Sequence, residues 1–207
     1  MTQAAVASQI LEWGWAGRAL ALESGDLHVV VPFADGALVA LIDGLGHGEE
    51  AAAAACAAVA ILESHAQEPV QHLLQRCHEG MRKTRGAVMS LASFDARGAS
   101  MTWTGVGNVA AVLLRADDAP GPAAEALVAR GGVVGYQLPP ARVATLRVWR
   151  GDVLVMATDG IRAGFAAGIA TPHPPQEIAE SVLATFASGA DDARVVVARY
   201  LGTGAAP

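Results

Sequence analysis

The sequence predicts an α+β fold in which antiparallel strands form a layered β-sandwich with helices on its outer faces. Short strand-like runs separated by tight turn signals indicate hairpin connections. Helical patterns occur in only three segments, at residues 49–65, 70–84 and 176–187. The chain of 207 residues is 53% hydrophobic and 16% charged, which is enough apolar material for a two- or three-layer core. We expect a single domain over residues 1–207, with residues 202–207 as a frayed tail.

The first half of the chain predicts three strands followed by two helices. Residues 11–17, 27–33 and 37–43 are the strand-like runs, and Asp35-Gly36 is a hairpin turn signal between the last two. The alanine-rich stretch 49–65 predicts a helix that ends near Pro69. Apolar residues at helical spacing predict a second helix over residues 70–84.

The second half predicts mainly strands. Residues 87–95, 101–107 and 108–115 are strand-like, and the stretch 116–126 reads as a long loop because it is rich in Ala, Asp, Pro and Gly. Residues 141–149 and 152–158 are expected to pair as a hairpin through a turn at Arg150-Gly151. A helix over 176–187 and a strand over 193–200 complete the prediction.

Charge and cysteine usage exclude several classes of function. The 20 acidic and 14 basic residues give a net charge of -6, and the absence of any Lys/Arg block disfavours nucleic acid or an anionic membrane as a partner. Cys56 and Cys77 have no disulfide or zinc-site spacing. No signal peptide pattern is evident, and the uncharged run 51–62 is too short to span a bilayer. We therefore expect a cytoplasmic protein.

Aspartates recur at the ends of predicted strands, beside glycine or a second aspartate, at Asp26, Asp43, Asp159 and Asp191. A carboxylate supplies hard oxygen ligands, and a neighbouring glycine lets backbone carbonyls or waters approach a divalent ion. Each Asp-Gly pair is also an ordinary turn dipeptide, as at Asp35-Gly36. Asp43 differs because it ends a fully apolar strand and leads directly into a helix. Taken together, the four aspartates predict a site for paired divalent ions.

Five motifs occur in an order that resembles a known family: "SGD" at 24–26, "DGLGHG" at 43–48, "GVGN" at 105–108, "GDVLVMATDGI" at 151–161 and "DDARVVVA" at 191–198. They resemble the metal-dependent protein phosphatases of the PPM family, in the compact SpoIIE/RsbX-like bacterial branch and nearest to RsbX. The resemblance covers about residues 10–201. It implies an αββα four-layer sandwich and hydrolysis of phosphoserine or phosphothreonine in proteins.

The resemblance also implies a role for each acidic position. Asp43 matches the residue that bridges two Mn²⁺ or Mg²⁺ ions, and the Gly44 carbonyl matches a ligand of the second ion. Asp159 and Asp191 match ligands of the first ion, and Asp26 matches a residue that reaches the pair directly or through water. Ions about 3.5–4 Å apart would activate a shared water for attack on phosphorus. Asp43, Asp159 and Asp191 would then act in catalysis through that water, without a nucleophilic cysteine. Asp192 is expected to order the loop.

His47 lies inside the glycine-rich motif and is a candidate general acid for the leaving serine oxygen. The alternative is a solvent-facing residue at a helix start. Asn108 and its neighbouring glycines are expected to form a turn with positive φ.

The chain departs from the family pattern at two positions. Arg194 replaces the threonine of the last motif, so the hydrogen bonding of that loop must differ and activity could be lowered. Ala21 falls where eukaryotic members carry a phosphate-binding arginine, and Arg18 is a weak substitute whose side chain is expected to be solvated. Phosphate binding would then depend heavily on the metals.

The resemblance implies a substrate among phosphorylated STAS-domain or stressosome proteins of a partner-switching stress response. Two alternatives remain open. One is a degenerate phosphatase that acts as a non-enzymatic binding module in the same pathway, although clustered carboxylates without a cation would cost stability. The other is a metal-dependent hydrolase of small phosphoesters.

Overall fold

The computed structural model describes residues 10–20 and 23–202. In these residues the chain forms strands and helices in the order β1 (Leu11–Arg18), β2 (Asp26–Phe33), β3 (Gly36–Gly44), α2 (Glu49–His65), α3 (Val70–Gly80), β4 (Ala87–Asp95), β5 (Ser100–Val106), β6 (Ala110–Leu114), β7 (Ala124–Leu127), β8 (Val143–Arg147), β9 (Val153–Ala157), α4 (Pro175–Phe186) and β10 (Ala193–Tyr200). The strands build two five-stranded antiparallel sheets. The first sheet has the order β1-β10-β9-β6-β7, and the second has the order β2-β3-β4-β5-β8.

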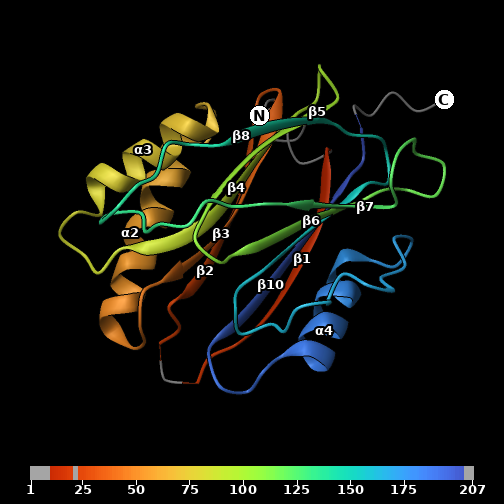
Figure 1. Cartoon of the computed structure of the whole chain (residues 1–207). Coiled ribbons are helices and arrows are strands. Elements are labelled where there is room, and N and C mark those ends of the chain that lie inside the picture. Colours follow the sequence, from red (N-terminus) through yellow and green to blue (C-terminus); the bar gives the residue numbers. More distant parts are fainter. Residues whose placement is uncertain (1–9, 21–22, 203–207) are drawn as a thin grey trace, which may run out of the picture.

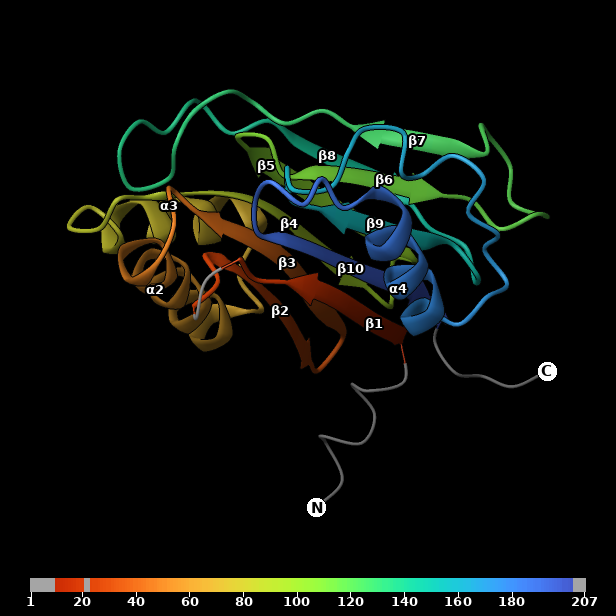
Figure 2. The same ribbon diagram turned by 90° about the horizontal axis from the view of Figure 1, so that it is seen from below.

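The two sheets pack face to face, and the helices cover their outer surfaces (Figures 1 and 2). Helices α2 and α3 pack on the second sheet, whereas α4 packs on β1 and β10 of the first. One apolar core therefore lies between the sheets and another lies under each helical layer. This arrangement confirms the predicted αββα sandwich.

Strand β3 shows why one run of the sequence is apolar without alternation. Residues 37–42 are all buried, because both faces of this strand are covered. Val39 and Leu41 belong to the core between the sheets, and Leu38 and Ile42 belong to the core under α2 and α3. A strand that is covered on both faces has no solvent side, so its sequence carries no polar alternation.

Several predicted elements are confirmed and several are wrong. Asp35-Gly36 does lie at the hairpin between β2 and β3. The predicted hairpin of 141–149 with 152–158 is wrong, since β8 pairs with β5 and β9 pairs with β6 and β10. The turn at Arg150-Gly151 instead carries the chain from one sheet to the other. Apolar spacing reports that a strand is buried but does not report which strand it pairs with.

Smaller differences concern where elements begin and end. The expected loop 116–126 contains the first part of β7, which pairs with β6. Helix α3 ends at Gly80 rather than at residue 84. Strand β6 begins at Ala110 rather than at residue 108, because the preceding residues pass from the second sheet to the first. Residues 203–207 of the expected tail lie outside the described residues.

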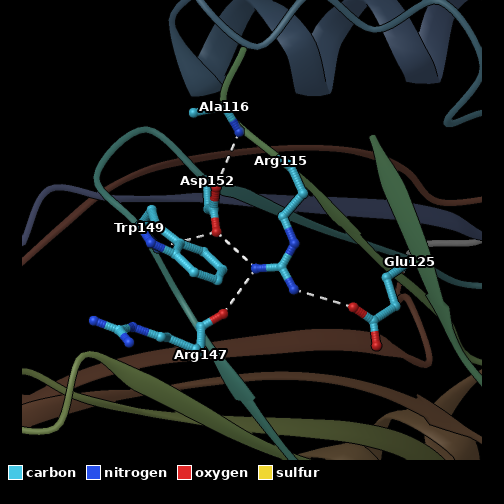
Figure 3. A network of polar contacts seen from close by, with 6 residues as sticks. All are labelled: Arg115, Ala116, Glu125, Arg147, Trp149 and Asp152. Atoms are coloured by element: carbon cyan, nitrogen blue, oxygen red, sulfur yellow. Dashed lines mark hydrogen bonds and ion pairs between the residues drawn. The ribbon is translucent and has the colours of Figure 1, made fainter. Parts of the chain in front are cut away.

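A buried ion-pair network ties strands of both sheets together (Figure 3). The Arg115 guanidinium donates to Asp152 Oδ2 at 2.8 Å, to Glu125 Oε2 at 3.0 Å and to the Arg147 carbonyl at 2.8 Å. Asp152 also accepts the backbone N–H groups of Ala116 and Trp149. These residues lie where β6 ends at Leu114 and β9 begins at Val153. The network therefore holds one end of the β6–β9 pair, and Ala110 and Ala157 lie at the other end.

Among residues 10–20 and 23–202, no helix has the length and apolar character needed to cross a membrane.

Candidate metal centre

The second sheet places Asp26 and Asp43 side by side. They are direct partners in the antiparallel pairing of β2 with β3. Side chains at directly opposite positions of such a pair have Cβ atoms about 4.5–5.5 Å apart. Asp26 is 2% exposed, whereas Asp43 is half-buried. The first two aspartates of the predicted site are therefore neighbours in the structure.

The first sheet brings Asp159 and Asp191 to the same end of the sandwich. Asp159 follows β9, Asp191 precedes β10, and these two strands are paired. Thr158 directly precedes Asp159, and its hydroxyl donates to Asp26 Oδ2 at 2.8 Å. This hydrogen bond bridges the two sheets. Asp43, Asp159 and Asp191 line one hollow of about 440 Å³, which we call the carboxylate hollow. His47, Asn108 and Gly132 are among its other lining residues.

Neutral donors hold the surrounding carboxylates in position. The Asn108 side-chain amide donates to Asp159 Oδ2 at 2.7 Å. Asp192 accepts the backbone N–H groups of Leu20 at 2.8 Å and Gly25 at 3.0 Å, so it ties the start of β10 to these two residues ahead of β2. Its own N–H donates to Asp191 Oδ1 at 2.8 Å.

Two of these supporting side chains were not predicted to have their roles. Thr158 carried no signal beyond its position directly before the Asp-Gly pair at 159–160. Asn108 was expected only in a turn, and its contact with Asp159 spans 51 positions of sequence. A contact of that span has no local pattern from which to infer it.

Burial and mutual repulsion raise the pKa values of the two central carboxyls. Burial raises the pKa of Asp43 to about 8, and the charges of Asp26, Asp159, Asp191 and Asp192 add to the rise. Burial also raises the pKa of Asp26 to about 6, although the hydrogen bond from Thr158 opposes this shift. In the described part of the chain, no Lys or Arg forms an ion pair with any of these five carboxylates.

The donor set fits hard divalent cations. Carboxylate oxygens are the ligands that Mg²⁺ and Mn²⁺ prefer, and a bound cation would remove the repulsion that raises the pKa of Asp43. Across residues 10–20 and 23–202, however, no three His, Cys, Asp or Glu side chains lie close enough together to hold a metal ion. Asp43, Asp159 and Asp191 line an open hollow rather than converge on one point. The number of ions, and the assignment of each ligand, stay predictions.

Gly44 has a packing reason to be glycine. A Cβ atom at this position would lie 2.1 Å from the carbonyl oxygen of Ala51 in the first turn of α2. Its N–H donates to the Gly25 carbonyl at 3.0 Å, which joins the loop of the first motif to the end of β3. The glycine therefore allows the first turn of α2 to pack directly against the end of β3. This reason for a glycine is independent of the predicted role of its carbonyl as a metal ligand.

The other residues considered in the sequence analysis are His47, the two cysteines, Arg18 and Ala21. His47 is exposed and lines the carboxylate hollow. Neither free cysteine lines it, and burial raises the pKa of the Cys77 thiol to about 12, which disfavours a thiolate nucleophile. The Arg18 side chain is exposed, as expected, and Ala21 lies outside the described residues.

The family model described as "Stage II sporulation protein E (SpoIIE)" matches residues 34–201. The chain belongs to the SpoIIE family. This membership agrees with the resemblance of its motifs to the SpoIIE/RsbX-like branch of the PPM family. A segment of 76 residues is 33% identical to the phosphoserine phosphatase RsbX of Bacillus subtilis (strain 168). That segment spans 37% of this chain and 38% of RsbX.

Solved structures agree with this assignment. One chain, from structural work on the bacterial stressosome as a modular system adapted to control secondary messenger signalling, is 30% identical with a TM-score of 0.81. The match covers 91% of this chain and 99% of that one. RsbX in complex with magnesium has a TM-score of 0.78 at 20% identity, over 93% of this chain and 96% of RsbX. This second likeness concerns the fold.

Proposed function

We propose that the protein is a metal-dependent phosphoprotein phosphatase that hydrolyses phosphoserine and phosphothreonine. The observation that carries the proposal is the gathering of carboxylates from both sheets around one hollow, none of which forms an ion pair with a Lys or Arg of the described residues. Membership in the SpoIIE family supports the same activity.

The residues that would hold two Mn²⁺ or Mg²⁺ ions are Asp43, Asp159, Asp191, the Gly44 carbonyl and, directly or through water, Asp26. When bound, such ions lower the pKa of a water and neutralise phosphate charge in the transition state. The chain's own contribution is orientation. Asn108 fixes one oxygen of Asp159, and Thr158 fixes one oxygen of Asp26.

His47 is the proposed general acid. Its imidazole lies at the same hollow as Asp43 and is exposed, so it can reach the oxygen of a serine or threonine that leaves phosphorus. Proton donation to that oxygen avoids the release of an alkoxide.

The proposed substrates are phosphorylated STAS-domain or stressosome proteins of a partner-switching pathway. Support comes from the likeness to RsbX and to a chain from the stressosome work. Both cysteines are free thiols, which is consistent with action in the reducing cytoplasm.

The test compares the wild-type protein with Asp43→Asn and Asp35→Asn, each incubated with Mn²⁺ and a phosphorylated STAS protein while phosphate release is followed. Asp43→Asn is expected to lower turnover on the order of 100-fold or more. Asp35→Asn is the matched control, because it changes the aspartate of another Asp-Gly pair at an exposed hairpin. Full activity of the Asp43 variant would refute the assignment.

Phosphate release, measured together with Mn²⁺ binding, also separates the two alternatives. Binding of Mn²⁺ without turnover of any phosphoprotein would favour the non-enzymatic binding module. Faster turnover of small phosphoesters than of phosphoproteins would favour the metal-dependent hydrolase of small phosphoesters.

A further inference from the structure

Arg194 occupies the position at which the family pattern has threonine, and its surroundings give it a fixed place beside the carboxylates. Its backbone N–H donates to Thr158 Oγ1 at 2.9 Å, and that hydroxyl donates to Asp26. Arg194 pairs with Gly17 across the β1–β10 ladder. The start of β10 is thereby linked to the first-motif aspartate through a single hydroxyl group.

The Arg194 side chain is held by residues from two edge strands. Its guanidinium carbon lies 4.7 Å from the centre of the Trp15 ring on β1. Nη1 lies 3.0 Å from Nδ1 of His28 on β2, and His28 also contacts Trp15, with 5.0 Å between ring centres. Stacking on one ring and a hydrogen bond to another fix a planar guanidinium more firmly than solvent would. We call Trp15, His28 and Arg194 the arginine clamp.

The clamp leaves the charge of Arg194 without a direct counter-ion. His28, its hydrogen-bond partner, carries no negative charge in either protonation state, so it cannot serve as a counter-ion. In the described part of the chain, Arg194 forms no ion pair, and its buried Nε has no hydrogen-bond partner. The nearby opposite charges that act on it are those of Asp26 and Asp192. His28 lies two positions after Asp26 on the same face of β2, so the contact with His28 places the guanidinium near this carboxylate but not in an ion pair with it.

We propose that Arg194 is a positioning residue that serves as the built-in counter-charge of the carboxylate cluster: it stabilises Asp26 and Asp192 before metal binds and weakens the affinity of the centre for divalent cations. This inference rests on the metal centre of the proposed function. The physical reason is that a fixed positive charge attracts the carboxylates and repels an incoming cation. A threonine at this position supplies neither effect.

Calorimetric titration of the metal-free protein with Mn²⁺ tests this role without any assay of phosphatase activity. Arg194→Gln is expected to bind Mn²⁺ roughly 3- to 10-fold more tightly than the wild type, and its metal-free form should melt at a lower temperature. Arg194→Met is a second neutral variant that keeps the apolar stem against Trp15. Arg194→Lys keeps the charge, so its affinity should stay within about 2-fold of the wild type.

Arg199→Gln is the matched control, since it makes the same change at the other end of β10, where Arg199 pairs with Glu12. It should lower thermal stability without changing the affinity for Mn²⁺. Unchanged or weaker Mn²⁺ binding by both neutral variants overturns the inference. Tighter binding by Arg194→Lys as well overturns it too, because the effect would then follow packing rather than charge.

Two further outcomes separate this inference from the proposed function. Wild-type protein that binds no Mn²⁺ at millimolar concentration would remove the metal centre and the role of Arg194 together. Charge-dependent affinities in a protein that hydrolyses no phosphoprotein would support the role of Arg194 and overturn only the activity.

Discussion

The hydroxyl of Thr158 donates a 2.8 Å hydrogen bond to Oδ2 of Asp26 across 132 positions of sequence. Thr158 follows β9 of the first sheet, and Asp26 begins β2 of the second. The same hydroxyl accepts the N–H of Arg194. One side chain therefore connects both sheets and the start of β10 at the end of the sandwich where the carboxylates lie.

Replacing Thr158 with valine is expected to destabilise the metal-free protein by about 1–3 kcal/mol, because the buried Asp26 loses its donor and the Arg194 N–H loses its acceptor. Chemical denaturation of wild type and variant measures the difference. Thr158→Ser keeps the hydroxyl and serves as the control, with a much smaller loss expected. Equal stability of the valine variant and the wild type would show that the bridge between the sheets contributes nothing.

Stability of the metal-free protein is expected to fall as the pH rises from about 4 to about 8. The pKa of Asp43 is raised from 3.8 to about 8, so the folded state binds more protons than the unfolded state within this window. The stabilisation is complete below the unfolded pKa and is lost as the pH rises through the folded one. Asp26, with a pKa raised to about 6, adds to the slope in the lower part of the window.

Melting temperatures of wild type and Asp43→Asn in a chelator, recorded between pH 4.5 and 8, measure this effect. Asn carries no titrating carboxyl, so the variant should show a shallower slope and should be the more stable protein near pH 8. Parallel curves for the two proteins would contradict the role of Asp43 in the repulsion.

Replacing Gly44 with alanine is expected to cost about 1–3 kcal/mol of folding free energy. The added methyl group would lie 2.1 Å from the Ala51 carbonyl oxygen, so α2 must shift away from β3. Gly131→Ala is the control, because a Cβ atom there meets nothing within 4 Å. Urea denaturation that ranked the two variants equally would show that the approach of α2 is not tight.

Replacing Asp152 with alanine is expected to destabilise the protein by about 3–5 kcal/mol, since it leaves the buried Arg115 charge with only the partly exposed Glu125 as its ion-pair partner. The side chains of Asp152 and Arg115 are 0% and 8% exposed. Asp35→Ala breaks an exposed ion pair with Arg97, for which a loss below about 1 kcal/mol is expected. Because the network lies at the end of β6 and β9 opposite to Ala110 and Ala157, Mn²⁺ affinity should not change in Asp152→Ala. It should not change in Asp35→Ala either, because Asp35 lies at the Phe33–Gly36 end of the β2–β3 pair, opposite to Asp26 and Asp43.

Much of the fold could be predicted because its signals are local. Apolar runs marked the buried strands, the alanine-rich segment marked α2, and Asp35-Gly36 marked a hairpin that the structure contains. The pairing of β8 and β9 was predicted wrongly, although both strands were recognised. Each strand carries its own apolar pattern, but the choice of a partner depends on the packing of both sheets at once.

The candidate site divides in the same way. The sequence by itself determined the acidic positions at strand ends and the family to which they belong, because each is written in adjacent residues such as Asp43-Gly44 and Asp159-Gly160. Only the tertiary structure decided that Thr158 bridges to Asp26, that Asn108 holds Asp159, and that Trp15 and His28 hold Arg194. These contacts join residues 51 to 179 positions apart. Two of them join neighbouring strands of the first sheet and two cross between the sheets, so they form only when distant strands come together and no local pattern can encode them.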